Sequence, residues 1–277
     1  MLGSFLIFAR EGIEGILICS ILLTALSAAG RRDLFRWVLA GAGAAVLVAI
    51  AAGLVLWAVG RATFVGSVSQ MWFETVVFVV AVAMLTYMTF WMRRHARSLG
   101  RDITARAAGA VAGGSVAALL LIAFVTVGRE ALEAMLFLVA IAYQSSPLQV
   151  GIGAALGLGL AVAVGVAMYH LGVRVNLGRF FAVLGSLLLL VAAGLLANAV
   201  QNLQQVGVLP GASMTVWNTS GALPDDRGIG DVLHGFVGYS ASPTLMQLAL
   251  WAAFLAAGLW LFLRPAHTPA RLRTSVS

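Results

Sequence analysis

The stretch FLIFAREGIEGILICSILLTAL, residues 5–26, decides the fold, because it is long and apolar but has charged residues in its middle. An apolar run of about 20 residues is what an α-helix needs to cross a bilayer. Arg10, Glu11 and Glu14 are unfavourable in hydrocarbon, and ionisable residues in membrane helices by default mark a working site. The stretch therefore predicts a membrane-spanning helix with a polar site near its middle.

The composition extends this interpretation to the whole chain. Of the 277 residues, 61% are hydrophobic and 10% are charged, and the mean hydropathy is +1.01. Soluble domains have about 25% charged residues, so we predict an all-α polytopic membrane protein. Residues 1–264 are expected to form a single transmembrane domain, with an external loop at 201–245, and residues 265–277 a cytoplasmic tail. The seven predicted transmembrane helices cover residues 4–28, 37–60, 69–92, 112–142, 149–172, 180–200 and 246–263.

The arginines predict the orientation of the chain in the membrane. All 17 basic residues are arginines. Thirteen of them lie in the connections on one side or after the last span, two lie in connections on the other side, and two lie within spans. Because cytoplasmic loops have the excess of positive charge, we expect the N-terminus outside and the C-terminus inside. This distribution explains the net charge of +7 without a nucleic-acid partner.

An internal repeat links two of the predicted spans. FLIFAREGIEGILI at residues 5–18 matches FVTVGREALEAMLF at residues 124–137, an offset of 119 residues, and both copies contain Arg-Glu-x-x-Glu. The copies lie in the first and fourth predicted spans, three spans apart, so the two helices cross the membrane in opposite directions. We expect an inverted repeat of spans 1–3 and 4–6 followed by a seventh span, an arrangement typical of transporters with a site near the midplane.

The glutamates and the aspartates are separated along the chain. All five glutamates lie in predicted spans and all five aspartates lie in loops. Residues three apart share a helix face, so Glu11 and Glu14 point the same way, as do Glu130 and Glu133. Both pairs lie at a similar depth, and small flanking residues allow two membrane helices to approach closely. We therefore expect four carboxylates in one intramembrane pocket.

Two arginines accompany the carboxylate pairs. Arg10 precedes Glu14 by four residues and Arg129 precedes Glu133 by four, which is within reach of an ion pair on a helix. We predict that these arginines orient the carboxylates and balance part of their charge. Four ionised carboxylates and two guanidinium groups leave a formal charge of −2, which a hard metal ion bound by oxygen donors neutralises. The repeat therefore predicts a metal site.

Four other acidic residues are weaker candidates. Glu74, also in a predicted span, is either an auxiliary metal ligand or relay, or a buried residue held by hydrogen bonds. Asp225, Asp226 and Asp231, in the external loop, either capture cations at the outer mouth of the protein or form an acidic turn. The sequence leaves these alternatives open.

Several stretches together resemble the oxidase-dependent iron permease family of the iron/lead transporter superfamily, in particular its bacterial members. The doubled Arg-Glu-x-x-Glu in seven predicted spans is the most specific feature of the resemblance, which covers nearly the whole chain. The stretches are FLIFAREGIEG, FWMRRHARSLG, VGREALEAMLFLVA, RVNLGRFFAVLGSLLLLVAAGLLANAV and GDVLHGFVGY.

The resemblance implies a permease of the cell inner (plasma) membrane, not an enzyme, that imports iron with the motif glutamates as ligands. It implies that an extracytoplasmic iron oxidase or iron-delivery protein converts Fe²⁺ to Fe³⁺ and hands it over. Iron is then the substrate, and no cofactor is permanently bound. A proton-coupled transporter of lead or manganese, a membrane-embedded carboxylate metalloenzyme and a homo-oligomer stay open as alternatives. A metalloenzyme is disfavoured because neither motif contains the His ligands such sites use.

Overall fold

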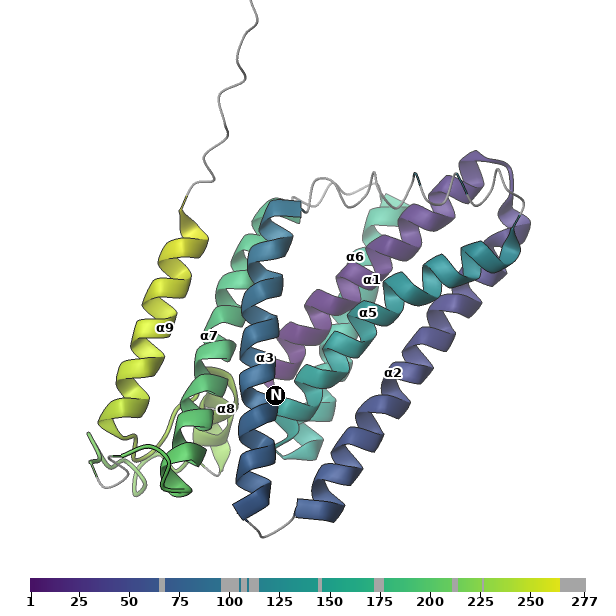
Figure 1. The fold of residues 1–277 in the computed structure, drawn as a ribbon. Helices are drawn as coiled ribbons and strands as arrows, with labels where there is room; N and C mark the ends of the chain where they lie inside the picture. Colours follow the sequence, from purple (N-terminus) through teal and green to yellow (C-terminus); the bar gives the residue numbers. More distant parts are fainter. Residues whose placement is uncertain are drawn as a thin grey trace, which may run out of the picture.

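The structure is a computed structural model that describes residues 1–64, 68–95, 105, 109, 115–143, 146–171, 177–210, 214–225 and 227–264. Helices dominate this part of the chain (Figure 1), and its β-structure is one isolated bridge between Thr215 and Thr244. The all-helical prediction is therefore confirmed. The named elements are α1 (Leu2–Ala28), the 3₁₀ helix η1 (Arg32–Leu34), α2 (Phe35–Phe64), α3 (Val68–His95), α5 (Val116–Ala142), α6 (Pro147–Leu171), α7 (Leu177–Gln205), α8 (Gly228–Val237) and α9 (Leu245–Leu263).

Five of the described helices are long and apolar enough to cross a membrane by length and composition. Two further helices, α1 and α5, have 27 residues each and contain the charged motifs in their middle. Residues 112–114, residue 172 and the tail 265–277 of the predicted organisation lie outside the described residues. The five apolar helices are Arg32–Ala62, Val68–Arg93, Pro147–Ala167, Phe180–Gln205 and Leu245–Leu263.

The long helices pack in pairs around α1 and α5. Helix α1 packs along α6 and crosses α5, helix α2 packs along α5, and helix α3 packs along α7, which also contacts α9. In Figure 1, α1 and α5 run side by side through the middle of the bundle, with α3, α7 and α9 on one side. The two helices that contain the repeated motif are therefore the central pair.

Two buried apolar clusters lie on either side of the charged turns of α1 and α5. The first contains Leu6 and Phe137 with side chains of α3 and α7, and the second contains Leu22 and Leu119 with side chains of α2. Lipid is as apolar as these side chains, so the clusters stabilise the bundle by close packing rather than by removal from water. The motif residues lie between the two clusters along α1 and α5.

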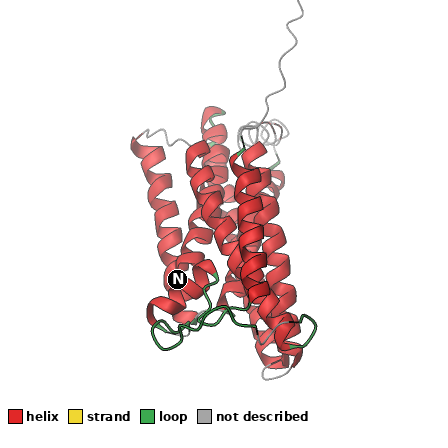
Figure 2. Ribbon diagram, turned by 90° about the vertical axis from the view of Figure 1, so that its left-hand side faces the viewer, coloured by secondary structure: helices red, strands yellow, loops and turns green. Residues whose placement is uncertain are grey.

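The connection between α7 and α9 differs from the loop expected at 201–245. Helix α7 continues to Gln205, and α8 (Gly228–Val237) lies within the connection and packs against α7 and α1. Gly238 ends α8 with a φ of 75°, which favours glycine, and the Trp251 indole donates a hydrogen bond to the Val237 carbonyl at 2.7 Å. Figure 2 shows the described part of this connection beside the N-terminus. The glycine and aspartate residues in and before this short helix made its sequence resemble a loop.

Two glycines allow the paired helices to approach closely, and we expect alanine to be unfavourable at both. A Cβ on Gly41 of α2 would overlap the Leu120 carbonyl of α5, and one on Gly153 of α6 would overlap the Met1 carbonyl. We predict that Gly41→Ala and Gly153→Ala each destabilise the protein by about 1–3 kcal/mol, as overpacking generally does. Thermal unfolding in detergent checks this.

Each of these variants has a matched control on the same helix. Among the described residues, nothing lies within 4 Å of the Cβ position on Gly43 or Gly151. Gly43→Ala and Gly151→Ala are expected to be neutral or slightly stabilising, because alanine is the better helix former. Equal losses at all four positions would contradict the packing argument.

Candidate metal site

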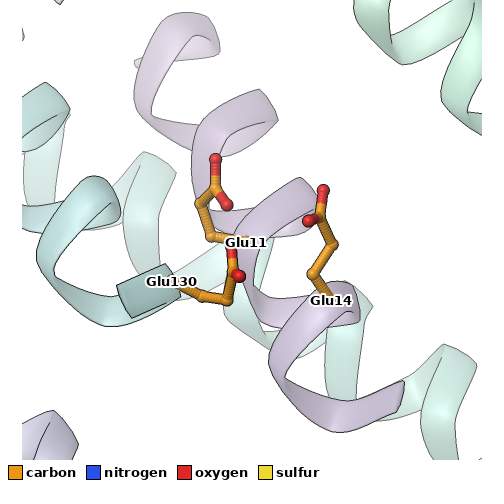
Figure 3. Close-up of side chains that lie close together, drawn as sticks. All are labelled: Glu11, Glu14 and Glu130. Carbon is orange, nitrogen blue, oxygen red and sulfur yellow. The ribbon is translucent and has the colours of Figure 1, made fainter. Parts of the chain in front are cut away.

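Three of the four motif carboxylates come together between α1 and α5. One oxygen from each of Glu11, Glu14 and Glu130 lies within 4.8 Å of the others, and all three residues are buried. Figure 3 shows Glu130 reaching from α5 to Glu11 on α1, with Glu14 one turn along α1. The predicted convergence of the two motif copies therefore holds for these three residues.

Each arginine bridges the two carboxylates of its own motif. The Arg10 guanidinium contacts a Glu11 oxygen at 2.9 Å and a Glu14 oxygen at 3.0 Å. The Arg129 guanidinium contacts Glu130 at 3.2 Å and Glu133 at 3.3 Å. Both motifs use the same geometry, because residues one and four positions after the arginine are within its reach on a helix. The predicted charge-balancing pairs are present in both copies.

Glu133, the fourth predicted ligand, lies outside the group of three carboxylates. Its oxygen is held by the Arg129 Nε atom at 3.3 Å, and the residue is buried. Arg129 connects Glu133 to Glu130, so a movement of this guanidinium changes the surroundings of both carboxylates. Glu133 is therefore a neighbour of the cluster in this conformation.

Several buried polar atoms of the site have no hydrogen-bond partner among the described residues. They include Oε2 of Glu11, Glu130 and Glu133, and Nη2 of Arg10. A buried polar atom without a partner is unfavourable by about 1–3 kcal/mol, and more when it is charged. Carboxylate oxygens with free lone pairs, gathered from two helices, are the donors that hard cations prefer. The donor set fits a multivalent cation such as iron.

Glu74 has hydrogen-bond partners of its own and is not in the carboxylate cluster. Gln70, one turn earlier on α3, donates to one Glu74 oxygen at 2.7 Å, and Asn202 of α7 donates to the other at 3.4 Å. The Asn202 contact ties α3 to α7. The structure thus gives Glu74 the surroundings of a hydrogen-bonded residue, whereas a role as relay stays a prediction.

The aspartates of the α7–α9 connection also have local partners. The Asp225 carboxylate accepts a hydrogen bond from the Ala241 backbone N–H at 3.0 Å, and the buried Asp231 accepts one from the Gln149 amide at 2.6 Å. The second bond ties α8 to the first turn of α6. Asp226 lies outside the described residues. Capture of cations by these aspartates stays a prediction.

Two residues of α3 adjoin the site without having been expected there. The Arg129 guanidinium lies 5.0 Å from the centre of the Trp91 ring, and its Nη2 atom is 3.9 Å from the Met88 sulfur. Trp91 lies in the stretch FWMRRHARSLG, but neither residue belongs to the repeated Arg-Glu-x-x-Glu motif. The signal lies only in how α3 is placed beside α5, which a single sequence does not contain.

The fold and the site together define a class of protein. Long apolar helices enclose buried carboxylates and the buried Arg10 guanidinium, and intramembrane ionisable groups of this kind mark ion pathways. The class is that of a multi-pass membrane transporter for a cation.

The comparison with known proteins gives the family. Residues 1–266 match the model of the Iron permease FTR1 family, and the chain belongs to this family. It is 32% identical to proteins named ferrous iron permease EfeU from Escherichia coli O6:K15:H31, over 100% of both chains, and from Yersinia pestis, over 98% of this chain and 96% of the relative. The EfeU of Shigella sonnei is also 32% identical, over 98% of each chain. No solved structure matches the chain.

Family membership confirms three of the expectations drawn from the sequence. The resemblance to iron permeases is confirmed, the chain is a multi-pass membrane protein, and it is an iron transporter rather than an enzyme. The metalloenzyme alternative is therefore set aside.

Proposed function

We propose that this protein imports iron into the cytoplasm through the site between α1 and α5, with Glu11, Glu14 and Glu130 as the first ligands. The observation that supports this most is the approach of three buried carboxylates, from two copies of one motif, to within 4.8 Å. Glu133 joins them when Arg129 releases it. Arg10 keeps two of the carboxylates oriented and limits the negative charge of the iron-free site.

We further propose that residues 1–264 form one transmembrane domain of seven spans, with the N-terminus outside and an inverted repeat of spans 1–3 and 4–6. Matched close contacts support the repeat. Three close contacts between α2 and α5 have counterparts between α6 and α1. In these counterparts the α1 residues are 119 positions before those of α5, and the α6 residues are 112 positions after those of α2. Gly41 lies against Leu120 and Ala123 as Gly153 lies against Met1 and Ser4. Gly53 lies against Met135 as Gly165 lies against Ile16. Gly128 lies against Ala45 as Ala9 lies against Gly157.

The transported ion in this proposal is Fe³⁺. All-oxygen, anionic donors favour hard cations, and Fe³⁺ is the harder of the two iron ions. The similar proteins are named ferrous iron permeases, which agrees with uptake of Fe²⁺ that an extracytoplasmic oxidase or delivery protein oxidises before the permease receives it. Rocking of the two repeats exposes the site to each side in turn, and protonation of the freed carboxylates assists release.

Iron uptake into proteoliposomes of the purified protein tests this proposal. Ferric citrate and anaerobic Fe²⁺ are supplied separately, with Mn²⁺ and Pb²⁺ as competitors and a pH-sensitive dye inside. We expect saturable uptake of iron, faster with Fe³⁺, and weak competition. Preferential uptake of Mn²⁺ or Pb²⁺ with proton flux would favour the alternative transporter. Uptake that is independent of pH, without proton flux, would contradict release by protonation.

A further inference from the structure

The two arginines of the repeat are equivalent in sequence and unequal in the structure. The Arg10 side chain is 3% exposed and its two carboxylate contacts are 2.9 and 3.0 Å long. The Arg129 side chain is 46% exposed and its contacts are 3.2 and 3.3 Å long. Arg10 is therefore enclosed by the bundle, whereas Arg129 lies at its edge with room to move.

Arg129 has a second set of neighbours on α3. Its guanidinium lies over the ring of Trp91, with centre 5.0 Å away, and Nη2 is 3.9 Å from the Met88 sulfur. An indole face is the best aromatic partner for a cation, and the attraction grows when the pair is shielded from water. A half-exposed guanidinium inside a membrane helix needs such a partner, and Trp91 provides one that is not a carboxylate.

A bound cation disfavours the contacts of Arg129 with its carboxylates but not its contacts with α3. The guanidinium groups contact one oxygen of the same carboxylates whose other oxygens have no hydrogen-bond partner among the described residues, and a cation of charge two or more bound to these carboxylates repels both arginines at this distance. Arg10 has no space to leave, because it is buried on all sides. Arg129 has both the space and an alternative partner.

We propose that Arg129 is the displaceable counter-ion of the iron site and that Trp91, which it already contacts, is the positioning residue that holds it when metal binds. This inference rests on the proposed function. Displacement of Arg129 frees Glu130 and Glu133 to complete the coordination of the ion that Glu11 and Glu14 hold. Return of Arg129 to its two carboxylates, with the guanidinium still over Trp91, expels the ion. Trp91 lies four residues before the end of α3 at His95, the end expected to be cytoplasmic.

A double-mutant cycle in iron affinity tests this pairing, because it isolates the coupling between two residues. The dissociation constant is measured by equilibrium dialysis of the detergent-solubilised protein against anaerobic Fe²⁺ and, in parallel, ferric citrate. We expect Trp91→Leu to weaken iron binding by roughly 3- to 30-fold, the range of a cation–π contact, and Trp91→Phe to have an intermediate effect. In an Arg129→Gln background, the same Trp91→Leu change is expected to alter the affinity by less than about 2-fold.

The chain offers a matched control for the tryptophan change. Trp57 lies under the Arg61 guanidinium, with centre 5.2 Å away, near the far end of α2, so Trp57→Leu removes the same kind of contact away from the site. This variant is expected to bind iron like the wild type. The inference would be overturned if Trp91→Leu changed the iron affinity equally in the wild-type and Arg129→Gln proteins, or changed it in neither. Absence of iron binding by the wild type would instead contradict the proposed function itself.

Discussion

Glu11→Gln is expected to abolish high-affinity iron binding and to lower iron uptake by about 100-fold or more. Glu11 belongs to the three-carboxylate group, is buried, and has one oxygen without a hydrogen-bond partner among the described residues. The amide keeps the size of the side chain but removes one anionic ligand. Loss of an outer-shell partner of a metal ligand already reduces affinity 10- to 100-fold, so loss of a ligand has at least the larger effect. Equilibrium dialysis and proteoliposome uptake measure both quantities.

Two further variants make this prediction specific to the site. Asp33→Asn also neutralises a carboxylate, but Asp33 is an exposed residue paired with Arg31, so uptake is expected to stay at the wild-type level. Glu133→Gln is expected to have a smaller effect on binding than Glu11→Gln, because Glu133 lies outside the group of three. Wild-type uptake by the Glu11→Gln protein would refute the assignment of the site.

The helical fold and the central pair of helices follow from features that one sequence contains. Apolar runs of sufficient length predict spans, and the repeated Arg-Glu-x-x-Glu places charges at matched positions of two helices. The structure adds that α1 and α5 are neighbours, which the small residues around the motifs had suggested. The sequence therefore predicted that carboxylates of the two motifs converge, and the structure brings Glu11, Glu14 and Glu130 together, whereas their role as metal ligands stays a prediction.

The differences between the two copies of the motif were beyond reach of the sequence. Arg10 and Arg129 both precede glutamates by one and four residues, and only the packing of other helices leaves Arg10 enclosed and places Arg129 against Trp91 of α3. The interval between α7 and α9 was equally hard to interpret, since its helix has only 10 residues. The unequal burial of the two arginines and the placement of α8 both depend on contacts between segments that are distant in the sequence. Such contacts leave no periodic pattern in a single sequence.

The same asymmetry predicts that removing Arg10 is far more damaging to stability than removing Arg129. The Glu11 and Glu14 side chains are only 2–3% exposed, and both contact the Arg10 guanidinium, at 2.9 and 3.0 Å. Arg10→Met therefore leaves two buried carboxylates without their counter-charge. Breaking a buried ion pair by deleting one partner destabilises a protein by about 3–5 kcal/mol. Arg129→Met is expected to cost less, because the Arg129 side chain is 46% exposed and its contacts to Glu130 and Glu133 are longer, at 3.2 and 3.3 Å. The unfolding midpoint in detergent compares the two variants.

A triple variant separates the lost charge balance from lost packing of the arginine side chain. Arg10→Met combined with Glu11→Gln and Glu14→Gln removes the charges together, and replacing a whole buried ionic group by neutral residues is often close to neutral for stability. We expect this variant to regain most of the stability that Arg10→Met loses, while iron uptake stays abolished because two ligands are gone. If the triple variant were as unstable as Arg10→Met alone, Arg10 would act by packing, and its role as the fixed counter-ion of the site would be wrong. Recovery of stability without recovery of uptake would instead mean that the buried charges are retained for transport, at the expense of the fold.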